Sequence, residues 1–163
     1  MNPAAESRGF WIILVTLFVA LALTVWPIPG GVVPYWPEWV ALILLHWCMA
    51  LPGRVSVGVC WISGIMLDVL RGALLGQHAL ALTIVALITL NWHLQIRVYP
   101  AWQQMLFVAF VLSVYEFILF WIGGIAGSTI GLSARMTPII LSVLLWPWLL
   151  NFLRFIRRRY QIS

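Results

Sequence analysis

The chain contains no lysine and little charge of any kind, since only 8% of its 163 residues are Asp, Glu, Lys or Arg. Soluble domains are about one quarter charged, so an ordinary water-soluble domain is excluded. The absence of lysine also excludes Schiff-base catalysis and the lysine-containing phosphate loop. The two cysteines, Cys48 and Cys60, lie inside apolar runs, which predicts small packing side chains and no disulfide framework.

Long apolar runs make up most of the chain, because 64% of the residues are apolar and the mean hydropathy is +1.05. About 20 apolar residues form a helix that crosses the hydrocarbon layer of a bilayer. Prolines, glycines and arginines divide the chain into six apolar runs. The pattern predicts an all-α polytopic membrane protein with one domain over residues 1–163. Its six transmembrane helices are expected at about 10–26, 39–51, 55–70, 78–92, 102–121 and 138–153, before a basic tail at 154–163.

Three segments leave room for alternatives in this scheme. The second and third runs are short, so they tilt little, thin the bilayer or form a re-entrant hairpin, and each alternative returns the chain to the same side. The glycine-rich segment 123–131 forms a loop, a continuation of the fifth helix or a re-entrant turn, and we favour the loop. Pro138 is predicted to lie in the first turn of the sixth helix, where proline is well tolerated.

The distribution of the nine arginines predicts the orientation in the membrane. With six crossings, seven arginines lie on one side, and only Arg71 and Arg135 lie on the other. Positive residues are enriched on the cytoplasmic side, so we expect both termini in the cytoplasm. Because most of the arginines are single and separated by apolar runs, we do not expect a nucleic-acid partner.

A dense basic cluster occurs near the end of the chain. Arg154, Arg157 and Arg158 are spaced to share one helical face, and Arg159 is adjacent. Such a cluster at the cytoplasmic surface attracts anionic lipid, at about 1 kcal/mol per basic residue. The alternative is that the cluster binds an acidic cytoplasmic partner.

Ionisable residues inside the predicted spans are the first candidates for function, because unpaired charge is costly in hydrocarbon. Asp68 and Glu116 lie towards the outer ends of their spans, and Arg71 and Arg135 lie at the same boundary. Asp68 and Arg71 are also three residues apart, on one helical face. We therefore expect a polar cluster on the outer side that fixes helix packing through ion pairs or binds a partner.

Small residues recur every four positions around Asp68, at Gly64, Gly72 and Gly76. Small side chains let two membrane helices approach closely. We expect the later glycines to leave the helix. The remaining small residues and the Asp68 region are predicted to shape a groove that a partner helix or a lipid fills.

No set of residues with catalytic or metal-binding spacing is present. His46, His78 and His93 are far apart, and no Ser-His-acid order stands out. We expect neither an enzyme, a metal nor a cofactor. A lipid-binding or transport subunit is the rival interpretation, with a pocket lined by Gln77 and His78 together with Asp68, Arg71 and Glu116.

Several short motifs, in their order and spacing, resemble the rod shape-determining membrane protein family MreD. They are Trp36-Pro37-Glu38-Trp39, His46-Trp47, Ala50-Leu51-Pro52-Gly53-Arg54-Val55, Gly64-Ile65-Met66-Leu67-Asp68 with Gly72 and Leu75-Gly76, Trp102-Gln103-Gln104, and Leu145-Trp146-Pro147-Trp148. The resemblance covers nearly the whole chain. It implies an acidic residue at position 115, where this chain has Tyr115 followed by Glu116.

The resemblance implies a non-enzymatic scaffold of the bacterial elongation machinery in the inner membrane, required for rod shape and lateral peptidoglycan synthesis. The implied partners are the bitopic protein MreC, the actin-like MreB, the glycosyltransferase RodA and the transpeptidase that works with RodA, besides membrane lipids. A homo-oligomer stays an open alternative. The implied fold is similar to the substrate-binding subunits of energy-coupling-factor vitamin transporters.

Overall fold

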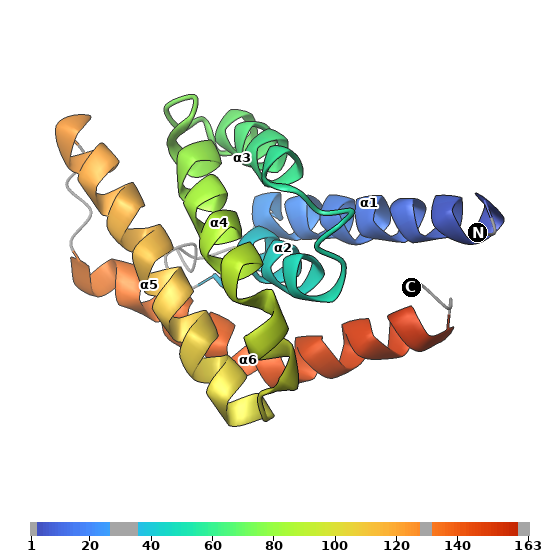
Figure 1. Cartoon of the computed structure of the whole chain (residues 1–163). Coiled ribbons are helices and arrows are strands. Elements are labelled where there is room, and N and C mark those ends of the chain that lie inside the picture. Colours follow the sequence, from blue (N-terminus) through green and yellow to red (C-terminus); the bar gives the residue numbers. More distant parts are fainter. Residues whose placement is uncertain (1–2, 27–35, 128–131, 160–163) are drawn as a thin grey trace.

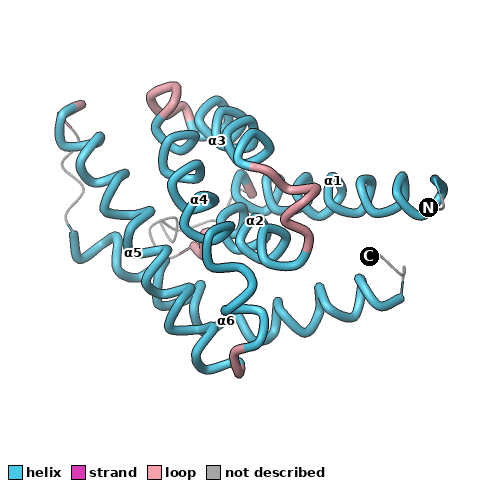
Figure 2. Tube along the Cα trace, in the orientation of Figure 1, coloured by secondary structure: helices cyan, strands magenta, loops and turns pink. Residues whose placement is uncertain are grey.

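The computed structural model describes residues 3–26, 36–127 and 132–159, and within these ranges it contains six α-helices and no strand (Figures 1 and 2). The side chains of residues 3–8 and 132–134 are not described. The helices are α1 (Pro3–Val25), α2 (Trp39–Ala50), α3 (Val57–Arg71), α4 (Gln77–Val98), α5 (Ala101–Ile125) and α6 (Leu132–Arg159). The all-α prediction is confirmed for this part of the chain.

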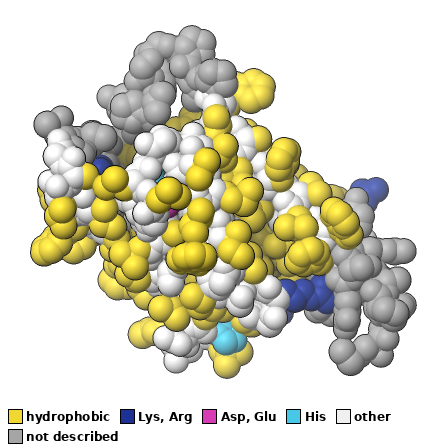
Figure 3. Space-filling view, turned by 90° about the horizontal axis from the view of Figure 1, so that it is seen from above, with side chains coloured by type: hydrophobic (Ala, Val, Ile, Leu, Met, Phe, Trp, Pro, Cys, Tyr) yellow, Lys and Arg dark blue, Asp and Glu magenta, His cyan; other side chains and the backbone are white. Residues whose placement is uncertain are grey.

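Three of these helices contain stretches long and apolar enough to cross a membrane, at Gln77–Val98, Ala101–Ile125 and Arg135–Arg159. Two further apolar stretches, Gly9–Val25 and Trp39–Ala50, are shorter. Six crossings therefore stay a prediction. The outer surfaces are largely hydrophobic, as Figure 3 shows for one face. Val98 and Ile125, for example, are each 83% exposed, as expected for side chains that face lipid.

The short helix α2 lies at the centre of the fold, where it packs against α1, α4 and α6 (Figure 1). Every residue from Val40 to Ala50 is buried. A helix that is apolar on all sides is typical of a position in which neighbouring helices surround and bury it. The indole Nε1 of Trp47 also donates a 3.0 Å hydrogen bond to Thr16 Oγ1 on α1.

Helices α4 and α5 both end later than their predicted spans, and α1 begins earlier, at Pro3. Helix α4 continues past residue 92 to Val98, and it ends there because the residue before Pro100 is restricted to extended backbone. Helix α5 continues through Gly123 and Gly124 to Ile125, so the loop prediction is wrong for these residues. The chain turns at Gly127, whose φ of +80° suits glycine. The rest of the glycine-rich segment, residues 128–131, lies outside the described ranges.

Helix α6 is longer at both ends than its predicted span. It begins at Leu132, so Pro138 lies beyond the first turn, and the prediction for this proline is wrong. Pro147 also lies inside the helix. Each proline removes one backbone donor, which packing against the other helices compensates. The helix runs on to Arg159, so the basic residues 154–159 extend α6.

Candidate functional site

Asp68 joins the end of α3 to the start of α4. Its side chain is completely buried and accepts hydrogen bonds from the backbone N–H groups of Gly76 (2.9 Å) and His78 (2.8 Å). The first N–H groups of a helix have no partner within that helix, so a carboxylate placed there satisfies them and opposes the helix dipole favourably. Gly72 (φ +61°) and Gly76 (φ +97°) form the intervening turn. The sequence therefore folds locally around one buried acid.

His78 connects Asp68 to Arg71. The Nδ1 atom of His78 lies 2.7 Å from Asp68 Oδ1, and its Nε2 atom lies 3.1 Å from a guanidinium nitrogen of Arg71. A carboxylate accepts and a guanidinium donates, so the contacts assign the hydrogen of a neutral imidazole to Nδ1 and leave Nε2 as the acceptor.

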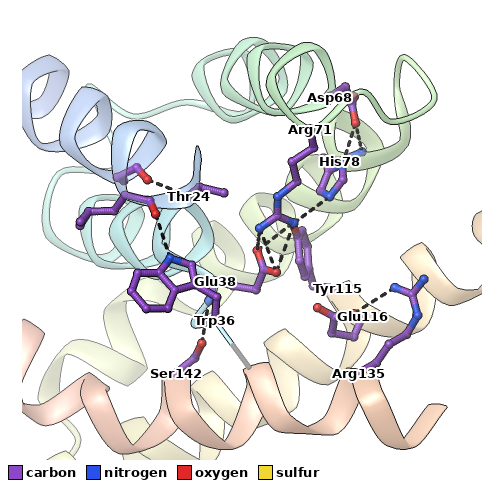
Figure 4. A network of polar contacts seen from close by, with 12 residues as sticks. Thr24, Trp36, Glu38, Asp68, Arg71, His78, Tyr115, Glu116, Arg135 and Ser142 are labelled. Atoms are coloured by element: carbon purple, nitrogen blue, oxygen red, sulfur yellow. Dashed lines mark hydrogen bonds and ion pairs between the residues drawn. The ribbon is translucent and has the colours of Figure 1, made fainter. Parts of the chain in front are cut away.

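Glu38 precedes α2 and collects contacts from three other helices (Figure 4). The two terminal nitrogens of the Arg71 guanidinium, Nη1 and Nη2, donate to the Glu38 carboxylate at 3.2 to 3.3 Å. The Tyr115 hydroxyl of α5 lies 3.4 Å from Glu38 Oε2, and the Glu38 backbone N–H donates to Ser142 Oγ of α6 at 3.0 Å. We call Glu38, Asp68, Arg71, His78, Tyr115 and Ser142 the Glu38 network. It links the start of α2 to α3, α4, α5 and α6.

A second ion pair joins α5 to α6 beside this network. An Arg135 guanidinium nitrogen lies 3.2 Å from Glu116 Oε2, and the two side chains are only 12% and 6% exposed. Charged groups in so dry a place are stable only when they are paired. Tyr115 and Glu116, which are adjacent in sequence, thus serve different contacts.

Asp68 and Arg71 share a helical face but contact different partners. Arg71 contacts Glu38, and Asp68 contacts the start of α4. The sequence analysis named Glu38 only as part of a motif and did not predict its contact with Arg71. An available signal was its position as an acid directly before a long apolar run. The role of Ser142 had no such signal.

Gly64 lies at a close contact between two helices of the chain. A Cβ atom at Gly64 would lie 2.3 Å from Cα and 2.6 Å from N of Ala79, so α3 and α4 touch at this point. The predicted groove on this face is therefore filled by α4. Gly72 and Gly76 leave the helix, as expected, and serve the turn.

The basic residues near the end of the chain face a different part of the molecule. Arg154, Arg157 and Arg158 line a hollow together with Arg97 of α4, whereas Arg159 is exposed and is not among its lining residues. Along α4, His78 and Arg97 are separated by about 29 Å at 1.5 Å per residue. Along α5, the separation between Gln104, which also lines the hollow, and Tyr115 is about 17 Å. The hollow and the Glu38 network thus lie towards opposite ends of the helices.

Groups of His, Cys, Asp or Glu that could hold a metal ion do not occur in the described ranges. Cys48 and Cys60 are free and buried, with their Sγ atoms 3.7 Å apart. In the Glu38 network Glu38 pairs with Arg71, and Asp68 accepts from His78 and from the backbone at the start of α4. The arrangement therefore fixes helices relative to one another.

Comparison with known proteins assigns the chain to a family. Residues 6–156 match the family model of the rod shape-determining protein MreD. The chain is also 30% identical over 153 residues to the rod shape-determining protein MreD of Haemophilus influenzae (strain ATCC 51907 / DSM 11121 / KW20 / Rd), an alignment that covers 93% of this chain and 94% of that protein. No solved structure matches the chain. A buried polar network between apolar helices, together with these two matches, leads to one conclusion: the chain belongs to the rod shape-determining MreD family of membrane proteins.

Proposed function

We propose that this chain is a non-enzymatic scaffold in the bacterial inner membrane that binds MreC within the elongation machinery. Its family gives it a role in cell shape. The observation that carries the proposal is the family match over residues 6–156, which includes all the residues of the Glu38 network. The resemblance also implies MreB, RodA and its transpeptidase as members of the same complex, acting in lateral peptidoglycan synthesis.

The contacts of the Glu38 network support a scaffold. Glu38 and Asp68 are 6% and 0% exposed, and their hydrogen bonds are made to other helices or turns of the same chain. Buried polar groups that are fully paired make one packing arrangement more favourable than others. A partner would therefore meet helices with fixed relative positions.

The outward face of α3 is the surface that we propose for MreC. Trp61, Ile62, Met66 and Val69 recur at helical spacing on this face, and each is about half exposed or more. Helix α3 has 15 residues, or about 22 Å, which is short for a hydrocarbon layer of about 30 Å. A membrane helix of MreC packed along α3 would cover this apolar face.

We further propose six crossings with both termini in the cytoplasm. The arginine distribution supports this orientation. The start of α1 and the end of α6 also point towards the same side of the molecule (Figure 1). The likeness to vitamin-transporter subunits stays an expectation of fold.

The rival function, a transport or lipid-binding subunit, would need Gln77, His78, Asp68, Arg71 and Glu116 to line a pocket. Asp68, His78 and Glu116 are at most 5% exposed, and they bond to residues of the chain itself. This geometry favours the scaffold for that end of the molecule.

Co-purification tests the proposal. The chain and MreC of the same organism are produced together, extracted in mild detergent and purified through a tag on this chain. We expect MreC to be retained in stoichiometric amounts. Absence of MreC beside a monodisperse, folded chain would overturn the proposed function.

Two matched variants test the proposed surface. Ile62 of α3 and Leu106 of α5 are 57% and 63% exposed, so a bulkier side chain fits at either position without disturbing the interior. We expect Ile62→Trp to lose most of the MreC and Leu106→Trp to retain it. Equal retention by both variants would remove α3 as the contact surface while leaving MreC binding in place.

A further inference from the structure

The end of α4 and the start of α5 lie beside α6 (Figure 1). A hollow of about 190 Å³ is lined by residues of these three helices and of α2. Four arginines line it, namely Arg97 of α4 and Arg154, Arg157 and Arg158 of α6. Two polar side chains, His46 of α2 and Gln104 of α5, complete its polar wall. Four helices therefore bring these groups together, although Arg97 and the α6 arginines are more than 50 positions apart.

The charge in this hollow is not balanced from within the described part of the chain. Arg97, Arg154 and Arg158 all act repulsively on Arg157, and Arg154 and Arg157 also act on His46. No carboxylate is among the lining residues. The described carboxylates Glu38, Asp68 and Glu116 bond to other groups elsewhere. An anion bound among these like charges would relieve their mutual repulsion.

Two buried polar atoms in the wall lack a partner. His46 is 4% exposed, and its Nε2 atom makes no hydrogen bond. Gln104 is 2% exposed, and its Nε2 donates to the carbonyl oxygens of Ile96 (3.0 Å) and Tyr99 (3.1 Å). Those two acceptors fix the orientation of the amide, so Oε1 is the atom left without a donor. Buried polar atoms are normally paired, so these two atoms are available to a ligand that enters the hollow.

We propose that this hollow binds the phosphate group of an anionic phospholipid whose head group also carries a hydroxyl. The arginines and His46 Nε2 donate to the phosphate oxygens, and the head-group hydroxyl donates to Gln104 Oε1. Guanidinium groups match phosphate geometry, because two parallel N–H groups meet two oxygens. This inference goes beyond the proposed function and does not depend on MreC.

The surroundings of the hollow favour a lipid as the source of the phosphate. Met49 and Leu150 form an apolar part of its wall. Val98 and Phe155, which are neighbours of Arg97 and Arg154 in sequence, are 83% and 59% exposed. A volume of 190 Å³ is below the ~300 to 1,000 Å³ of whole small-molecule sites. It suits a head group, while the acyl chains lie on the outer apolar surface.

Thermal unfolding of the purified full chain in non-ionic detergent tests the proposal. Phosphatidylglycerol, phosphatidylcholine and inorganic phosphate are each titrated, and the shift of the midpoint temperature gives an apparent affinity. We expect phosphatidylglycerol to stabilise the chain saturably and phosphatidylcholine to have little effect. An equal shift with phosphatidylcholine would overturn the proposal, and a full shift with inorganic phosphate alone would overturn its lipid source.

Matched variants locate the site. Arg97→Gln and Arg154→Gln each remove one arginine of the hollow, from different helices. Arg159→Gln removes the same charge from the same end of α6 but outside the hollow. We expect about fivefold weaker binding of phosphatidylglycerol for each of the first two and an unchanged affinity for the third. Equal weakening by Arg159→Gln, or unchanged binding by both Arg97→Gln and Arg154→Gln, would overturn the site.

Discussion

Glu38 and Arg71, which lie 33 positions apart in the chain, are joined by three hydrogen bonds of 3.2 to 3.3 Å. This contact ties the start of the central helix α2 to the end of α3. The Glu38 side chain is 8% exposed and that of Arg71 is 28% exposed, so the carboxylate is the group that depends more on its partner. Its loss should therefore affect the packing of several helices at once.

Removal of the Arg71 guanidinium should destabilise the protein. Arg71→Ala leaves a buried carboxylate without its main partner, which costs about 3 to 5 kcal/mol in buried pairs. Arg71→Lys keeps the charge but loses the two-pronged geometry, so a smaller loss is expected. Thermal unfolding in detergent measures both. An Arg71→Ala variant as stable as the unchanged chain would contradict the role given to this pair.

Asp68 is expected to be a structural residue of the α3–α4 turn. Asp68→Ala removes the acceptor for two backbone N–H groups and for His78, and unsatisfied buried donors cost about 1 to 3 kcal/mol each. Asp68→Asn keeps one oxygen and should lose less. Hydrogen exchange at the amides of Gly76 and His78 is the direct measurement. Unchanged protection of these amides in Asp68→Ala would be inconsistent with the cap.

Gly64 is predicted to tolerate no side chain. In Gly64→Ala the new methyl group would meet the backbone of Ala79, so α3 and α4 must separate, at a cost of about 1 to 3 kcal/mol or more. Gly58 of the same helix is the control, because a Cβ there would contact only Ser56 Oγ at 3.7 Å. Gly58→Ala should be stabilising by about 0.5 to 1 kcal/mol. If Gly64→Ala unfolded at the same midpoint temperature as Gly58→Ala, the close contact between α3 and α4 would be contradicted.

Gly72 is predicted to resist substitution for a different reason. Its surroundings leave space for a methyl group, but its φ of +61° is unfavourable for other residues, so Gly72→Ala should cost about 1 to 2 kcal/mol. Gly124, within α5, also has open space but an ordinary helical backbone, so Gly124→Ala should be neutral or stabilising. The difference in midpoint temperature between the two variants is the measurement, and no difference would contradict the assigned turn.

The Glu116–Arg135 pair should allow exchange of its charges. Glu116→Arg or Arg135→Glu alone places like charges together in a dry environment and should lower stability or yield strongly. The double variant restores an opposite pair and should recover a large part of the loss. A double-mutant cycle on yield and midpoint temperature gives the coupling. Additive losses would show that the two side chains do not interact.

Local features of the sequence were sufficient for several parts of the fold. The apolar runs predicted an all-α membrane protein, because a chain in lipid must satisfy its backbone within helices. Pro100 ends α4 because it restricts the residue before it to extended backbone, and Gly127 lets the chain turn because glycine adopts a positive φ. The order of short motifs indicated the family, which the matches confirmed. The glycines at 123 and 124 misled the prediction, because weak helix formers remain helical when neighbouring helices pack on them.

The apolar sequence by itself determined that this is a helical membrane protein and which residues begin and end several of its helices. Only the tertiary structure decided which polar groups meet. Spacing within one helix identifies neighbours three or four residues apart, such as Asp68 and Arg71, but it does not identify contacts between helices. The contacts of Glu38 instead reach across 33, 77 and 104 positions, to Arg71, Tyr115 and Ser142. Such contacts depend on how six helices pack, because burial of apolar surface sets the positions to which the few charged groups must then adapt.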